Sequence, residues 1–90
     1  MLFSVYDQKA AAFLDPFVAP TIDFAIREFR TAVNSPKHQF ARYPEDYVLF
    51  KLGEFDPDTG LVLPEAAPVN ISIGLTLVEG VEEPVGAFDA

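Results

Sequence analysis

The sequence YVLFKLGEFDPDTGLVLP, residues 47–64, predicts a β-hairpin on which the rest of the fold is arranged. YVLFKLGEF is rich in aromatic and aliphatic residues that favour strands. DPDTG has the composition of a turn, in which Gly60 suits a backbone with positive φ, and LVLP returns as the partner strand. An antiparallel sheet is therefore expected.

The stretch VNISIGLTLV, residues 69–78, shows the clearest alternation in the chain. This period of two is typical of an antiparallel strand with one face on the core, and we expect a strand here that is separate from the one at 61–64. The expected core face carries Ile71, Ile73, Leu75 and Leu77, and the outer face Asn70, Ser72, Gly74 and Thr76.

Two further strands are expected at the N-terminal end. LFSVY, residues 2–6, alternates with the same period and predicts a half-buried strand. AAAFLDPFVAP, residues 10–20, is apolar, but Pro16 and Pro20 cannot donate a backbone hydrogen bond. An irregular edge strand fits this stretch best.

A single long helix is predicted to begin after Thr21, which is a suitable N-cap, and to end before Pro36. Phe24 falls outside its apolar stripe and is expected on the far side with Thr31, near Arg27. An exposed ring of this kind marks a candidate oligomer interface. The predicted buried stripe contains Ile22, Ala25, Ile26, Phe29 and Val33.

These elements predict an α+β fold: a single small domain, with one helix packed on an antiparallel sheet of four to five strands in the order β-β-α-β-β-β. The domain is expected to cover residues 1–78. Residues 79–90, with two glycines, one proline and four acids, are expected to form a flexible acidic tail. The tail either competes with DNA for a basic surface or only keeps the protein in solution.

Charge is distributed unevenly along the chain. The net charge is −8, yet residues 1–51 contain six cations and six acids, whereas residues 52–90 contain eight acids and no cation. An acidic average normally argues against nucleic-acid binding, because phosphates are repelled. Here the average conceals an N-terminal part in which positive charge is available.

Several functional classes are disfavoured. The chain has no cysteine, and His38 is its single histidine, so neither a thiolate metal site nor a histidine-assisted nucleophile is expected. Asp56 and Asp58 have turn spacing, not that of a calcium loop. We expect no enzyme, no cofactor and no metal. Neither a signal peptide nor a membrane span is indicated, so an intracellular location is expected.

A cluster of cations and aromatics suggests a nucleic-acid-binding surface. Cations contact backbone phosphates, and aromatic faces stack on unpaired bases. The alternative is an ordinary solvated helix face and loop. The candidate residues are Arg27, Arg30, Lys37, His38, Phe40, Arg42 and Tyr43.

Several ordered blocks make the chain resemble a known family: LFSVYDQKA, AFL with PF, PT leading to AIREF, AVNSPKHQF, PEDYVLFKLGEFD and TG. Over residues 1–78 it is similar to the small nonstructural protein of the gokushoviruses, which are microvirus single-stranded DNA phages. The resemblance implies a DNA-binding accessory protein that acts in genome replication or in the switch from duplex synthesis to packaging. It also implies the cytoplasm of the bacterial host as its location.

The partners implied are single-stranded DNA of the phage genome and phage or host replication proteins. A chain this small often completes its core by association, so a homo-oligomer, with a dimer first, is also expected. The alternative function is a protein-interaction module, a homodimer or capsid-assembly adaptor that uses Phe24 and the sheet edge and binds no DNA.

Overall fold

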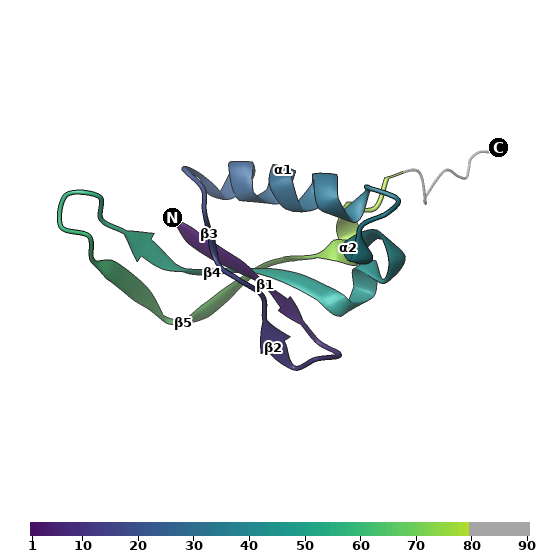
Figure 1. Ribbon diagram of the computed structural model, residues 1–90, viewed down its shortest axis with the longest axis horizontal. Helices are drawn as coiled ribbons and strands as arrows, with labels where there is room; N and C mark the ends of the chain where they lie inside the picture. The colour runs from purple at the N-terminus through teal and green to yellow at the C-terminus, as the bar shows by residue number, and fades with distance from the viewer. Residues whose placement is uncertain (80–90) are drawn as a thin grey trace.

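One helix lies across one face of an antiparallel five-stranded sheet in the computed structural model, which describes residues 1–79 (Figure 1). The α+β class expected from the sequence is confirmed. A short helix and two 3₁₀ turns connect the larger elements. The elements are β1 (Leu2–Asp7), β2 (Ala12–Phe13), β3 (Phe17–Val18), α1 (Ile22–Val33), α2 (Gln39–Arg42), η1 (Pro44–Asp46), β4 (Tyr47–Phe55), β5 (Val62–Ile73) and η2 (Gly74–Leu77).

The strand order is β2-β1-β4-β5, and β3 pairs with the same edge of β1 as β2 does. β1 therefore lies in the middle of the sheet, between β4 and the two short strands. Its pairing with β4 runs from Asp7↔Tyr47 to Leu2↔Gly53, whereas the β4–β5 pairing continues beyond this point to Phe55↔Val62. The end of the hairpin thus extends past the rest of the sheet.

The predicted hairpin turn is confirmed. Gly60 has a φ of 77°, and its N–H donates to the carbonyl of Asp56 at 2.7 Å. The Asp56 carboxylate accepts from the Asp58 N–H at 2.9 Å. Both aspartates thus belong to turn chemistry, because an aspartate side chain readily accepts from a backbone N–H two residues on.

The two strands predicted at 61–64 and 69–78 are instead one bent strand, β5, which passes through EAAP without a break. The four residues 65–68 stand opposite the single residue Leu52, between the pairs Lys51↔Val69 and Gly53↔Pro64. β5 lies at the sheet edge, where the missing N–H groups of Pro64 and Pro68 are tolerated.

The same strand ends earlier than predicted. Residues Gly74–Leu77 form the turn η2, so Leu75 is exposed and Leu77 only half-buried. Gly74 is buried so close to its neighbours that a Cβ there would lie 2.7 Å from the Pro44 carbonyl oxygen and 3.4 Å from Phe29 Cζ. This close approach lets the chain turn beneath α1 instead of continuing the alternation.

The segment before the helix contains two short strands, where one irregular strand was predicted. The buried Ser4 hydroxyl donates to the carbonyl of Leu14 at 2.6 Å, between these two strands. Ala11, in the turn after β1, has a φ of 55°. The chain therefore turns sharply, pairs briefly with one end of β1, and then pairs with the other end.

The core lies between α1 and the sheet. Thr21 caps the helix as predicted, and its Oγ1 accepts from the Phe24 N–H at 3.0 Å. Of the predicted buried stripe, Ile26 is half-buried and Ile22 is exposed at the first turn. The core residues are Phe3, Val5, Ala19, Ala25, Phe29, Val33, Phe40, Tyr47 and Leu49.

The predicted acidic tail lies outside the described residues, except for Glu79. The N–H of Glu79 donates to Asn34 Oδ1 at 2.8 Å, while Asn34 Nδ2 donates to the carbonyl of Leu77 at 3.0 Å. Asn34 therefore joins the end of α1 to the last described residues of the chain.

Candidate nucleic-acid interface

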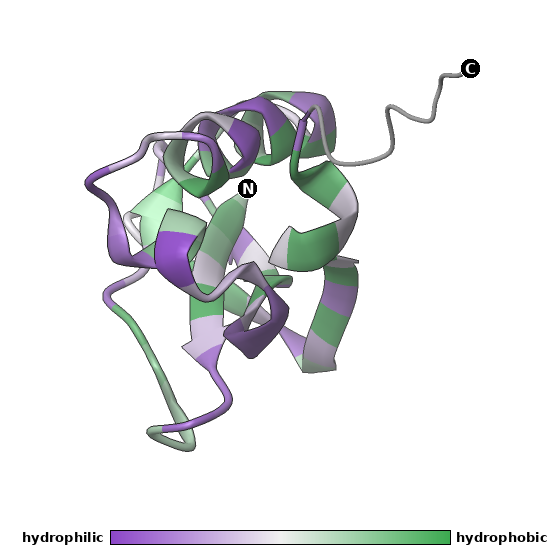
Figure 2. Ribbon diagram, turned by 90° about the vertical axis from the view of Figure 1, so that its right-hand side faces the viewer, coloured by the Kyte–Doolittle hydropathy of each residue, from purple (hydrophilic) through white to green (hydrophobic). Residues whose placement is uncertain are grey.

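Arg27 and Arg30 are exposed on α1, off the stripe that faces the sheet. Figure 2 shows how hydrophilic and hydrophobic residues alternate along this amphipathic helix. Two residues three apart on a helix are neighbours on its surface, so these two guanidinium groups share one side of α1. Lys37 follows in the exposed turn after the helix, and Arg42 is exposed at the end of α2.

Among residues 1–79, none of these four cations forms an ion pair. Lys51 differs from them, because its ammonium group lies 2.9 Å from Glu54 Oε2 and 3.0 Å from Glu65 Oε2. Hydrogen bonds to these two glutamates raise the pKa of Lys51, and the bond from Lys51 lowers the pKa of Glu54. The last cation of the sequence is thus paired with acids of β4 and β5.

His38 is exposed in the turn between the two helices, where it caps α2. Its Nδ1 accepts from the Phe40 N–H at 3.1 Å, and its ring lies 4.3 Å from that of Phe40. An Nδ1 that accepts from the backbone cannot donate to a phosphate at the same time, which leaves Nε2 as the donor of this ring. The structure therefore gives His38 a local structural role.

Phe40 is buried, with only 7% of its surface exposed, and belongs to the core. Its ring centroid lies 5.6 Å from that of Phe29 and 4.5 Å from that of Tyr47. The suggestion that Phe40 stacks on a DNA base is corrected by this placement, because a ring enclosed by core aromatics presents no free face to a base.

Tyr43 is 54% exposed, and it lines a hollow with three acids and Lys9, to which no residue of α1 contributes. Burial, followed by the charges of Asp7 and Asp46, raises the pKa of the neighbouring Tyr47. Such carboxylates repel phosphate, so the ring of Tyr43 is displayed in an unfavourable place for DNA. The hollow is lined by Asp7, Lys9, Tyr43, Glu45, Asp46 and Tyr47.

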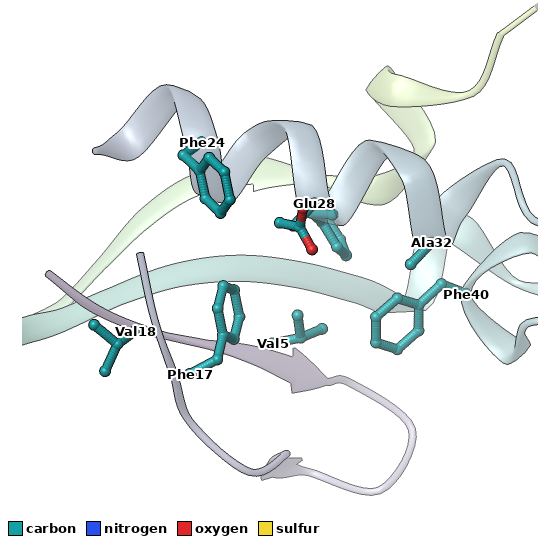
Figure 3. A pocket seen from close by; sticks show the side chains of 8 residues that line it. Val5, Phe17, Val18, Phe24, Glu28, Ala32 and Phe40 are labelled. Atoms are coloured by element: carbon teal, nitrogen blue, oxygen red, sulfur yellow. The ribbon is translucent and has the colours of Figure 1, made fainter. Parts of the chain in front are cut away.

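Phe24 is 41% exposed, as expected of an exposed ring, but it does not point to the far side of the helix. Figure 3 shows its ring directed from α1 toward Phe17 and Val18, at the mouth of an apolar groove of about 330 Å³. The helix period alone placed Phe24 opposite the stripe. The short strand β3 places Phe17 and Val18 opposite this side of the helix and so gives the ring apolar neighbours (Figure 3).

Sequence reasoning missed this groove between α1 and the N-terminal strands. Phe17 and Val18 were a usable signal, since both are large apolar residues in a segment that was expected to be irregular. Glu28 is the charged residue in its lining. We call this feature the groove; its lining is Val5, Phe17, Val18, Phe24, Glu28, Phe29, Ala32 and Phe40.

No helix within residues 1–79 is long and apolar enough to cross a membrane. The same residues contain no group of three or more His, Asp or Glu side chains placed to hold a metal ion.

Comparison with known proteins places the chain in a family. The model of the family described as "Phage ORF5 protein" matches residues 1–77. "Protein ORF5" of Chlamydia phage 1 is 37% identical over 71 residues, which is 74% of this chain and 74% of that protein. No solved structure gives a match. The chain therefore belongs to the Phage ORF5 protein family, in agreement with its resemblance to the small nonstructural proteins of gokushoviruses.

Proposed function

We propose that this chain is a non-enzymatic phage accessory protein that binds single-stranded DNA during genome replication or during the switch to packaging. One observation carries the proposal: Arg27, Arg30, Lys37 and Arg42 are all exposed and form no ion pair within residues 1–79. An ion pair on the surface contributes little to stability and occupies its cation. An unpaired surface cation is available to bind a phosphate.

The separation of charges supports the same function. The acids of the hairpin, Glu54, Asp56, Asp58 and Glu65, lie on β4, β5 and the turn between them, and the described cation among them, Lys51, is paired. In Figure 1 the tip of this hairpin and α2 are at opposite ends of the molecule. A chain with a charge of −8 can thus present a locally positive surface to DNA.

The exposed cations favour binding to the phosphate backbone of DNA over stacking on its bases. With Phe40 in the core and Tyr43 among acids, cations remain as the principal contacts. Phosphate contacts carry no information about base sequence. We therefore expect affinity for single strands that depends strongly on salt and little on sequence.

Fluorescence anisotropy of a labelled single strand tests the proposal with charge-matched variants. Arg27→Glu and Arg30→Glu should each weaken binding about tenfold or more, because a charged hydrogen bond contributes about 1.5–3 kcal/mol. Lys9→Glu changes the net charge equally. Lys9 is also exposed and without an ion pair among residues 1–79, but it shares a hollow with Asp7, Glu45 and Asp46, which repel phosphate, so its variant should leave the affinity close to that of the unchanged protein.

Equal losses in all three variants would mean that only the overall charge matters, and the assignment of the surface to α1 would be wrong. Absence of binding by the unchanged protein at low salt would reject DNA binding altogether. The interaction module without DNA binding would then be the better account, and the groove is the observation that favours it.

A further inference from the structure

The end of the β4–β5 hairpin has no third strand beside it. Pairing with β1 stops at Gly53, so residues 54–63 form a two-stranded extension, which we call the ribbon. The ribbon projects from one end of the molecule, whose extents are 55 × 26 × 24 Å (Figure 1). Isolated two-stranded hairpins are marginally stable in water, and they generally need a third strand or a packing partner.

The ribbon also exposes a run of large apolar side chains. Phe55 and Val62 face one another across the two strands and are 42% and 53% exposed, while Leu61 and Leu63 are 58% and 53% exposed. Successive strand residues point to opposite faces, so the Phe55–Val62 pair exposes apolar surface on one face and Leu63, paired with Glu54, on the other. Apolar surface on a projecting element marks an interaction surface, whereas single exposed apolar residues are unremarkable.

The groove lies near the base of the ribbon. β3, which forms one wall of the groove, pairs with β1 at Leu2↔Val18, and Leu2 pairs on its other side with Gly53, where the ribbon begins. No ribbon residue lines the groove of its own chain. Phe24 and Val18 in the groove lining are 41% and 62% exposed, and Figure 3 shows Phe24 and Phe17 facing one another from α1 and β3. One molecule therefore carries two uncovered apolar features close together.

Charge indicates how a ribbon could enter a groove. The ribbon carries Glu54, Asp56 and Asp58 and no cation. Glu54 is paired with Lys51 and with the amino group of Met1 in its own chain, so Asp56 and Asp58 at the turn are the acids left for a partner. Arg27 lies three residues after Phe24, hence beside it on the helix surface, and forms no ion pair within the described chain. Glu28 in the groove lining repels these acids. The acidic turn of an entering ribbon is therefore favoured on the side of the groove where Arg27 lies. Two ribbons packed on each other would instead bring like charges together.

We propose that the ribbon of a second copy of this chain packs into the groove, with its apolar residues against Phe24 and Phe17 and its acids toward Arg27. Since ribbon and groove lie near the same end, a two-fold axis beside that end allows both contacts at once, and the assembly closes as a dimer. This contact buries apolar surface that each chain alone leaves in water. The inference does not rest on DNA binding, and its tests contain no DNA.

Light scattering coupled to size-exclusion chromatography measures the predicted assembly in the full chain. The unchanged protein should have twice the monomer mass of 9.9 kDa. Phe24→Ser in the groove and Phe55→Thr with Val62→Thr in the ribbon should each restore the monomer mass. Leu75→Ser is the matched control, because Leu75 is 53% exposed in η2, outside both features, and its variant should remain dimeric. Circular dichroism verifies that each variant is folded.

Cysteine cross-linking tests the pairing itself, in a chain that has no cysteine of its own. A Phe24→Cys protein mixed with a Val62→Cys protein should form a disulfide between the two chains on mild oxidation, since disulfides require Cα atoms roughly 4.4–6.8 Å apart. Lys9→Cys, in place of either partner, should form far less.

Three results would overturn the inference. The first is a monomer mass for the unchanged protein throughout the micromolar range. The second is a dimer that both Phe24→Ser and the ribbon variant leave intact. The third is cross-linking of Val62→Cys to itself in preference to Phe24→Cys, which would indicate a ribbon-to-ribbon contact.

Discussion

Replacing Phe40 with alanine distinguishes a core residue from a base-stacking one. The ring is 93% enclosed, since 7% of its surface is exposed, and it packs against Phe29 and Tyr47. Removal of such a ring typically costs about 3–5 kcal/mol, because the lost burial and the remaining cavity both destabilise the fold. A domain of this length has a stability of about 5–13 kcal/mol, so Phe40→Ala should approach the limit of folding.

Urea unfolding followed by circular dichroism measures this effect. With a slope of about 1 kcal/mol per molar for a small protein, the midpoint should fall by about 3 M or more. Phe40→Leu keeps most of the apolar volume, so its urea midpoint should fall much less than that of Phe40→Ala. Tyr43→Ala is the exposed control and should shift the midpoint only slightly, since surface substitutions usually change stability within about 0.5 kcal/mol.

The opposite pattern would refute the reasoning. If Phe40→Ala left the midpoint unchanged but weakened DNA binding by the ~1–3 kcal/mol typical of a stacked base, Phe40 would belong to the binding surface after all. Its burial beneath α1 would then be an incorrect description of the folded protein.

Two further predictions concern polar contacts. Glu54→Gln should lower stability near neutral pH, because Lys51 lowers the pKa of Glu54 in the folded protein. The loss should shrink as the pH falls below the ordinary glutamate pKa of about 4.3 and through the lower folded-state value, and denaturation over a series of pH values measures this. Asn34→Ala should lower the free energy of unfolding by about 1–2 kcal/mol and speed hydrogen exchange at the Glu79 amide. Asn34→Asp keeps an oxygen that accepts from this amide, so exchange there should be slower than in Asn34→Ala.

The features that sequence predicted correctly depend on local chemistry. The hairpin turn follows from Gly60 and its flanking aspartates, and the helix start from the hydroxyl of Thr21. Each signal lies within a few residues of the structure that it determines. The fold class follows from these elements together with the alternation of the strands.

The features that sequence missed depend on contacts distant in the chain. The strands expected separately at 61–64 and 69–78 are one strand, since the edge position of β5 tolerates Pro64 and Pro68. Phe40 is in a segment without a period, and its burial depends on how α2 packs under α1. Phe24 was assigned by helix period alone, although β3 lies along that side of the helix. None of these neighbours can be read from the surrounding residues.

The sequence predicted which cations belong to the candidate site. It did not predict which of them are free of ion pairs on the folded surface. The sequence identified Arg27, Arg30, Lys37 and Arg42, and the structure leaves all four exposed. The absence of ion pairs for these four within residues 1–79, and the pairing of Lys51, depend on side-chain positions that no spacing rule supplies.

Salt dependence of single-strand binding by the full chain tests the central claim most directly. Each phosphate contact makes the slope of log affinity against log salt more negative by about 0.7 for a single strand. Four contacting cations therefore predict a slope of about −3. Arg30→Glu, which lies outside the proposed contact with a second copy, should bring that slope closer to zero by about 0.7. Binding with this slope would support a DNA-binding surface built on α1, and binding that ignores salt, or no binding at low salt, would contradict it.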